Sequence, residues 1–165
     1  MSIESDPVQV ATPSDVLALK GRALGPSIWI PVGQDRIDAF ARAAEDWHWA
    51  HNDVERASRG PFGATIGHAH LTLSLVPHLF ASLIQFADRE DAMFYGYNRV
   101  RFPTAVPAGS SVRMRADVVD VVDVGGGEQL TVDLSIEILG VDRPGCVAHA
   151  LFRHYHVKAP PRLTT

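Results

Sequence analysis

Residues 45 to 53 combine a high density of titratable side chains with two large indoles. The stretch reads EDWHWAHND and contains two histidines, two tryptophans and three carboxylates. A carboxylate and an imidazole held against apolar walls can keep complementary protonation states near neutral pH, which suits them to general acid–base catalysis. The alternative is a helix end whose polar groups only cap the helix and face solvent. The rest of the chain has to decide between these two interpretations.

The elements that would position this stretch lie in a helical first half. The segment GQDRIDAFARAAEDWHWA, residues 33 to 50, spaces its apolar side chains as one face of a helix does. The next segment, RGPFGATIG, holds three glycines and a proline and predicts a loop. Residues 68 to 89 are apolar on most sides, which predicts a long helix surrounded by protein, in which Pro77 produces a kink or opens a turn.

The second half of the chain predicts an antiparallel sheet. QLTVDLSIEIL, residues 129 to 139, alternates apolar and polar side chains, as a half-buried strand does. Further strands are predicted at 93–102, 111–124 and 145–157, with a hairpin turn at Gly125–Gly127. One buried helix followed by such strands predicts an α+β fold in which the sheet wraps the helix. The sheet would leave an apolar edge or face, so we expect a homodimer.

The stretch EDWHWAHND, continued by RGPFGATIGHAHLTLSLVP, resembles the signature of the MaoC-like dehydratases, the R-specific enoyl-CoA hydratases. Within that family it is most similar to the nodulation-protein-N-like branch. LKGRALGPSIWIPVGQDRIDAFA and YNRVRFPTAVPAGSSVRMRADV support the resemblance, which covers about residues 14 to 158. It implies a hotdog fold: a long central helix wrapped by an antiparallel sheet, with an overhanging segment near residues 35 to 60 carrying the active site. We expect one domain over residues 15–158 and flexible tails at 1–14 and 159–165.

The resemblance also implies a reaction. Asp46 and His51 match the family's catalytic acid–base pair, which would hold a water and deliver it to C3 of a trans-2-enoyl thioester. The product is an R-3-hydroxyacyl thioester, and the reverse reaction is dehydration. Which residue is the base stays open. The backbone N–H of Ala69, at the start of the central helix, is implied as the donor to the thioester oxygen.

Several residues depart from the family pattern. Glu45 and Ala69 stand where the family has glycine, and His48 stands where it has Asn or Gln. Ala50 replaces a larger aliphatic residue, and His70 replaces Tyr or Met. We interpret His48, Ala50 and His70 as signs of a wider and more polar site, suited to an oxygenated or bulky acyl group such as a polyketide-like intermediate.

Other residues are assigned supporting roles. His48, His68, His70 and Trp49 are expected around the pair or in the pocket, with the two indoles of the stretch forming a dry wall. His68, at the start of a buried helix, favours a structural role over a catalytic one. Arg59, Arg99 and Arg101 are weak candidates for the phosphates of CoA or of a carrier protein's pantetheine, as is Arg56.

Composition bounds the remaining possibilities. The 165 residues are 46% hydrophobic with a net charge of −4, which fits one globular domain and gives no reason to expect nucleic-acid binding. Cys146 is the only cysteine, the N-terminus is no signal peptide and no segment is long and apolar enough to be a membrane span, so we expect a cytoplasmic protein. We expect no metal and no cofactor beyond the thioester carrier, CoA or a carrier protein. Two rival functions remain: a thioesterase or isomerase on a related thioester, and a non-catalytic acyl-binding protein.

Overall fold

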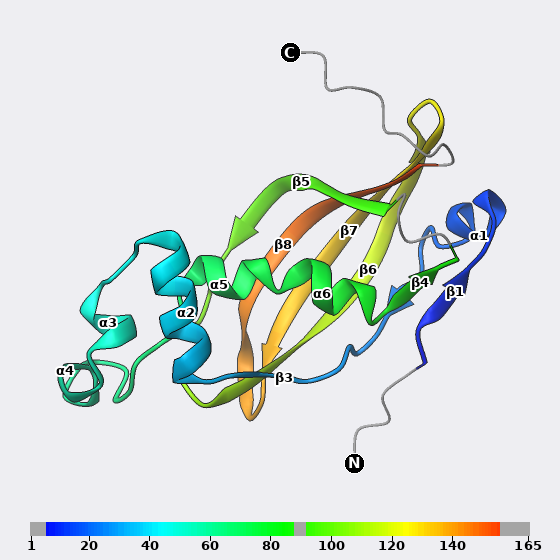
Figure 1. Ribbon diagram of the computed structural model, residues 1–165. Helices are drawn as coiled ribbons and strands as arrows, with labels where there is room; N and C mark the ends of the chain where they lie inside the picture. Colours follow the sequence, from blue (N-terminus) through cyan, green and yellow to red (C-terminus); the bar gives the residue numbers. More distant parts are fainter. Residues whose placement is uncertain (1–5, 88–91, 156–165) are drawn as a thin grey trace.

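The computed structural model describes residues 6–87 and 92–155. A curved sheet packs against a pair of consecutive helices, α5 and α6 (Figure 1). The helices α2, α3 and α4 project from one end of this layer, while α1, β1 and β4 lie at the other end (Figure 1). The α+β arrangement predicted from the sequence is confirmed.

The main sheet has six strands, and every pair within it is antiparallel. Its order is β2-β6-β7-β8-β5, and β3 also pairs with β6. The short strands are β2 (Ala23–Leu24) and β3 (Ile30–Val32). The long strands are β5 (Ala92–Arg101), β6 (Ser110–Asp123), β7 (Gly127–Ile138) and β8 (Val141–Tyr155).

The alternating pattern in β7 sets which face of the sheet is buried. Leu130, Val132 and Ile136 are fully buried toward the helices, whereas Asp133 between them is exposed. Burying one face of such a strand stabilises the fold by roughly 1.5–3 kcal/mol for each large aliphatic side chain. The predicted hairpin turn between β6 and β7 is confirmed. Gly125 and Gly126 both have positive φ there, which a residue with a Cβ rarely adopts.

The predicted central helix is shorter than expected and is interrupted. It forms α5 (Ala69–Ser74) and α6 (Val76–Ala81), separated at Leu75. Pro77 lies in the first turn of α6, so the interruption follows from its missing N–H and its ring. The prediction that the helix continues to residue 89 is wrong, because Ile84–Phe86 form strand β4 instead.

The N-terminal region also differs from the expectation. The flexible tail predicted for residues 1–14 is wrong for residues 8–14, because β1 (Val8–Val10) pairs in parallel with β4. Helix α1 (Pro13–Leu17) follows, and Thr12 caps its first turn in a capping box with Asp15. Residues 1–5, and the tail predicted at 159–165, lie outside the described residues.

The overhanging segment consists of three short helices. These are α2 (Gln34–Ala44), α3 (Trp49–Asn52) and α4 (Val54–Ser58). Helix α2 ends six residues before the predicted helix end at residue 50, and the predicted loop over residues 59–67 is confirmed. Within residues 6–87 and 92–155, no helix is long and apolar enough to cross a membrane.

Candidate active site

Asp46 follows directly on α2 and is held through its backbone. Its N–H donates to the Ala41 carbonyl at 3.2 Å, and its carbonyl accepts from Nε2 of His68 at 3.0 Å. Because both backbone groups are bonded, the direction of the Asp46 side chain is constrained although the residue is exposed.

His51 lies on α3 and is oriented by the loop that follows α4. Its Nδ1 lies 2.7 Å from the Ile66 carbonyl, an acceptor, so Nδ1 carries the proton and Nε2 keeps a lone pair. Burial lowers the pKa of His51, and the nearby His68 lowers it further, while the Ile66 bond and Asp46 oppose the shift. The imidazole is therefore kept neutral to lower pH than an ordinary histidine.

His68 brings these two residues together with the central helix. It precedes α5, is buried, and its ring stacks on that of His51 with 3.7 Å between centroids. The carboxylate of Asp46 and one ring nitrogen each of His51 and His68 lie within 4.8 Å of one another. A single water can bridge polar atoms at that separation.

The same three side chains would be the candidates for a metal ion. A metal needs lone pairs that converge on one point, and an imidazole lone pair lies in its ring plane. The rings of His51 and His68 are stacked, with only 27° between their planes, and a metal ion bound by both would have to lie in both ring planes.

A cavity of about 460 Å³ opens beside the Asp46–His51 pair. The polar wall contains both members of the pair together with His68 and His70. Ala69, the first residue of α5, also lines it, and the first N–H groups of a helix have no partner within the helix. The Asp46 carboxylate, the His51 imidazole and the first residue of α5 therefore line one cavity.

The apolar wall of the cavity comes from residues that the sequence analysis did not assign to the site. It includes Phe62, Ile66, Phe102 and Val106, and Gly145 also lines the cavity. Phe62 belongs to the quoted Gly-Pro-Phe-Gly stretch, so the motif held a signal for it. Nothing local marks Val106 or Gly145, because their positions depend on how the strands are paired.

A polar network built on Gln34 fixes the helix that carries His51. The Gln34 amide donates to the His51 carbonyl at 2.7 Å and to Asp38 at 2.9 Å. Its oxygen accepts from the hydroxyl of Thr65, the neighbour of the residue that orients the His51 ring. Asn52 also donates to Asp38 at 2.7 Å, and the two side-chain amides lower the pKa of the Asp38 carboxyl. Gln34 thus holds the backbone of His51 and the loop that orients the His51 ring. No sequence pattern indicated this role.

His48 and the two indoles lie apart from the cavity. His48 caps α3, with its Nδ1 accepting from the Ala50 N–H at 3.3 Å. Trp47 is 57% exposed, and Trp49 packs under the guanidinium of Arg56 in a separate hollow. The predicted dry wall of indoles is wrong for the described chain, because α2 ends at Ala44 and the indoles leave its apolar face.

All four arginine candidates are exposed, and none of them lines the cavity. Arg59 forms an ion pair with Glu55 in the hollow beside Trp49. Arg99 lies in a hollow with Asp133 and His149, and Arg101 donates to the Val100 carbonyl.

Glu45 has the only positive φ of a non-glycine residue among those described, at 55°. It ends α2 in the left-handed conformation, a position where glycine is usual. A residue with a Cβ is destabilised there by roughly 1 kcal/mol relative to glycine. The sharp reversal aims the next residue, Asp46, toward the cavity.

We therefore expect Glu45→Gly to raise the free energy of unfolding by about 1 kcal/mol and the melting temperature by about 2–4 °C. Thermal unfolding followed by circular dichroism measures both. Glu45→Gln, which removes the charge but keeps the Cβ, should leave the melting temperature unchanged. If Glu45→Gly lowers the melting temperature instead, the left-handed conformation of Glu45 does not destabilise the protein and this explanation is wrong.

Two curated relatives match nearly the whole chain. The 3-hydroxyacyl-thioester dehydratase Z of Mycobacterium tuberculosis (strain ATCC 25618 / H37Rv) is 41% identical over 142 residues, which are 86% of this chain and 94% of that protein. Nodulation protein N of Rhizobium leguminosarum bv. viciae is 38% identical over 140 residues, which are 82% of this chain and 86% of that protein.

Solved structures define the class of fold. A MaoC-like dehydratase from Rhodospirillum rubrum superposes with a TM-score of 0.68 at 16% identity, covering 82% of this chain and 92% of that one. The (R)-hydratase from A. caviae involved in PHA biosynthesis superposes with a TM-score of 0.67 at 20% identity, covering 81% and 94%. The sheet wrapped around a central helix is thus the hotdog fold. The MaoC-like domain model matches residues 15–137, and the chain belongs to that family.

Proposed function

We propose that this protein adds water to a trans-2-enoyl thioester, giving an R-3-hydroxyacyl thioester, and catalyses the reverse dehydration. The proposal rests on one observation. A carboxylate oxygen of Asp46 and a ring nitrogen of His51 lie within 4.8 Å of each other, and both residues line the cavity that the start of α5 also lines. Its relative of 41% identity is named a 3-hydroxyacyl-thioester dehydratase, which supports the same reaction class.

The hydrogen bonds of His51 suggest how the two residues share the work. Since Nδ1–H donates to Ile66, Nε2 is free to take a proton from the water while the oxygen bonds to C3 of the substrate. Asp46 accepts a hydrogen bond from the same water and orients it, and the proton taken up at Nε2 of His51 is then delivered to C2, so one proton leaves the water and one reaches the substrate. In dehydration the same two transfers run backwards.

The start of α5 supplies the third element of the proposal. Negative charge develops on the thioester oxygen as water adds, and a fixed N–H at a helix start stabilises that charge. Ala69 offers this donor on the wall of the cavity that contains the dyad. Neither a metal nor a redox group takes part in this scheme.

We further propose that the site is completed in a homodimer. Phe62 and Phe102 line the cavity yet are 52% and 38% exposed in the single chain. A second copy that covers these rings would exclude water from the reacting groups, which strengthens their electrostatic interactions.

A hydration assay with chiral product analysis tests the proposal. Purified protein should consume crotonyl-CoA and form R-3-hydroxybutyryl-CoA, with the rate unchanged after dialysis against a chelator. Release of free CoA, or migration of the double bond without hydration, would assign the site to a thioesterase or an isomerase instead.

The lowered pKa of His51 predicts the pH dependence of the reaction. His51 acts as base only when neutral, so kcat/KM should fall as pH drops through a pKa below the ordinary histidine value. The effect of pH on folding stability has the same sign. Between the pKa of His51 in the folded chain and its higher value in the unfolded chain, the unfolded chain binds a proton that the folded chain does not. Folding stability should therefore also fall with decreasing pH in that window.

Rates measured with crotonyl-CoA across pH give the acid limb directly. His48 contributes to the lowered pKa, so His48→Gln should shift the limb toward the ordinary histidine value. An acid limb at or above the ordinary value in the unmodified protein would contradict the assignment of His51 as the base.

A further inference from the structure

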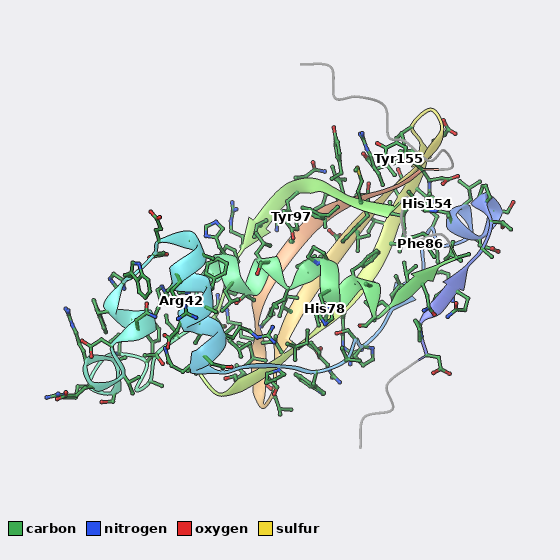
Figure 2. The ribbon with its side chains drawn as sticks, in the orientation of Figure 1. Arg42, His78, Phe86, Tyr97, His154 and Tyr155 are labelled. Atoms are coloured by element: carbon green, nitrogen blue, oxygen red, sulfur yellow. The ribbon has the colours of Figure 1, made fainter. Side chains whose placement is uncertain are left out.

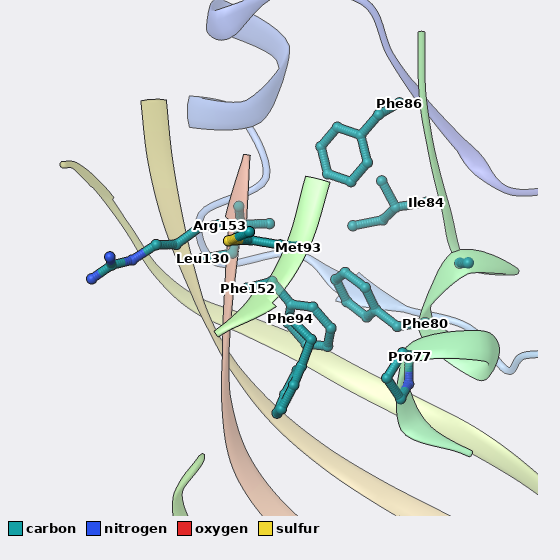
Figure 3. Close-up of a pocket in the computed structure, with 10 residues that line it drawn as sticks. Pro77, Phe80, Ile84, Phe86, Met93, Phe94, Leu130, Phe152 and Arg153 are labelled. Atoms are coloured by element: carbon teal, nitrogen blue, oxygen red, sulfur yellow. The ribbon is translucent and has the colours of Figure 1, made fainter. Parts of the chain in front are cut away.

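A second, apolar pocket lies along the same helix pair, toward the other end from the catalytic cavity. Its volume is about 170 Å³, and it is lined by residues of α6, β4, β5, β7 and β8. The rings of Phe80 and Phe152 stack in its wall with 3.9 Å between centroids (Figure 3). The Arg153 guanidinium points away from the apolar side chains (Figure 3), so the interior is hydrocarbon.

Tyr97 of β5 stands between this pocket and the catalytic cavity. Toward the pocket, its ring packs on Phe94 with 4.6 Å between centroids, and Phe94 lines the pocket. Toward the cavity, its hydroxyl lies 3.4 Å from the Leu73 carbonyl, one residue beyond Thr72 in the cavity wall. Figure 2 shows Tyr97 between β5 and the helix pair.

Cys146 gives a second link between Tyr97 and the cavity wall. After burial, Cys146 is the second cause of the raised pKa of Tyr97, and it directly follows Gly145 of the cavity. Burial raises the pKa of Tyr97 to about 12, so the hydroxyl stays protonated and can donate to a carbonyl.

The interruption of the central helix explains why the Tyr97 hydroxyl is directed at Leu73. In an α-helix the N–H of residue 77 would donate to the carbonyl of residue 73, but Pro77 has no N–H. Tyr97 supplies a donor to that carbonyl instead. The ring is thereby held across the space between strand and helix.

We infer that the apolar pocket is the distal compartment of the acyl-binding site and that Tyr97 limits the length of the acyl chain. The inference rests on the proposed function. With Tyr97 in place, the site takes a short acyl group that ends before the ring. Without the ring, a longer chain extends along the helix pair into the pocket.

The dimensions fit such a chain. Ala69 and Pro77 are eight residues apart, about 12 Å along a helix, which is the length of a medium acyl chain. Apolar cavities of about 150 Å³ bind a benzene ring, so this pocket has room for the last few carbons of a chain. Each methylene of the chain that leaves water for this pocket adds to the binding affinity.

Titration with saturated acyl-CoAs tests the inference without requiring turnover. Isothermal calorimetry would compare butyryl-CoA and dodecanoyl-CoA on the unmodified protein, Tyr97→Phe and Tyr97→Ala. We expect Tyr97→Ala to bind dodecanoyl-CoA about tenfold more tightly than the unmodified protein, with butyryl-CoA affinity unchanged. Tyr97→Phe keeps the ring and should match the unmodified protein.

A filled pocket provides the matched control. Ala81 lines the pocket and is exposed, so Phe should be tolerated there. Adding Ala81→Phe to Tyr97→Ala should abolish the tenfold gain in affinity for dodecanoyl-CoA.

The outcomes separate this inference from the proposed function. If Tyr97→Ala melts cooperatively and still shows the unmodified preference between the two acyl-CoAs, or if Ala81→Phe fails to cancel the gain, the inference is wrong. If the affinities change as expected but no variant hydrates an enoyl-CoA, the inference stands and the proposed reaction is wrong. Turnover with crotonyl-CoA and dodecenoyl-CoA should show the same selective gain in kcat/KM for Tyr97→Ala.

Discussion

Replacing Asp46 with asparagine should lower the rate of crotonyl-CoA hydration by about a thousandfold, the typical contribution of a positioned acid–base group. The variant keeps the size and the backbone bonds of Asp46, since both the N–H and the carbonyl that hold the residue are main-chain groups. What it loses is the negative charge that orients the water and stabilises His51 while its imidazole is protonated. The effect should therefore fall on kcat, with KM little changed.

His51→Gln should cause a loss of similar size. The glutamine can still form a hydrogen bond to the Ile66 carbonyl but has no basic nitrogen. Because the two residues act as a unit on one water, the double variant should be barely slower than either single variant. Both variants should unfold within a few degrees of the unmodified protein. A rate within tenfold of normal in either folded variant would remove the pair from the mechanism.

Replacing Ala69 with proline should also abolish most of the activity while preserving the helix. Proline is tolerated at the first position of a helix because no helical bond uses that N–H. The preceding His68 has φ −58° and ψ 141°, a conformation compatible with a following proline. The substitution therefore removes the proposed donor to the thioester oxygen, and losing one such donor lowers kcat by about a hundredfold to a thousandfold.

Ala69→Gly is the matched control for this donor. It keeps the N–H and removes only the methyl group beside the acyl carbonyl, so its activity should equal or exceed that of the unmodified protein. Steady-state rates of the two variants, with circular dichroism to confirm the helices, measure the effect. Equal activities in the proline and glycine variants would mean that the thioester oxygen is stabilised elsewhere.

The strands of the second half could be predicted because each carries its own evidence. The alternation in β7 needs no knowledge of its neighbours to indicate a half-buried strand, and the glycines after β6 indicate a hairpin. That Asp46, His51 and Ala69 line one cavity could be predicted because the motif that contains them is long and local.

The features that could not be predicted depend on contacts between residues that are distant in the sequence. The strand pair β1–β4 joins segments about 75 residues apart, and neither segment alone is long enough to indicate a strand. The polar network of Gln34 is likewise formed only after α2, α3 and the loop with Thr65 come together. The predicted position of the two indoles was wrong because the helix ends earlier than the apolar pattern indicated. A single residue in the left-handed conformation, Glu45, ends it.

The break at Leu75 divides the central helix into two parts, α5 and α6. On the proposed scheme, α5 holds the carbonyl end, whereas α6 packs against the hydrocarbon end. Substitutions in α6 can then retune which acyl groups are accepted without displacing the atoms that react. Related chains could diversify their substrates by this route while the chemistry stays constant.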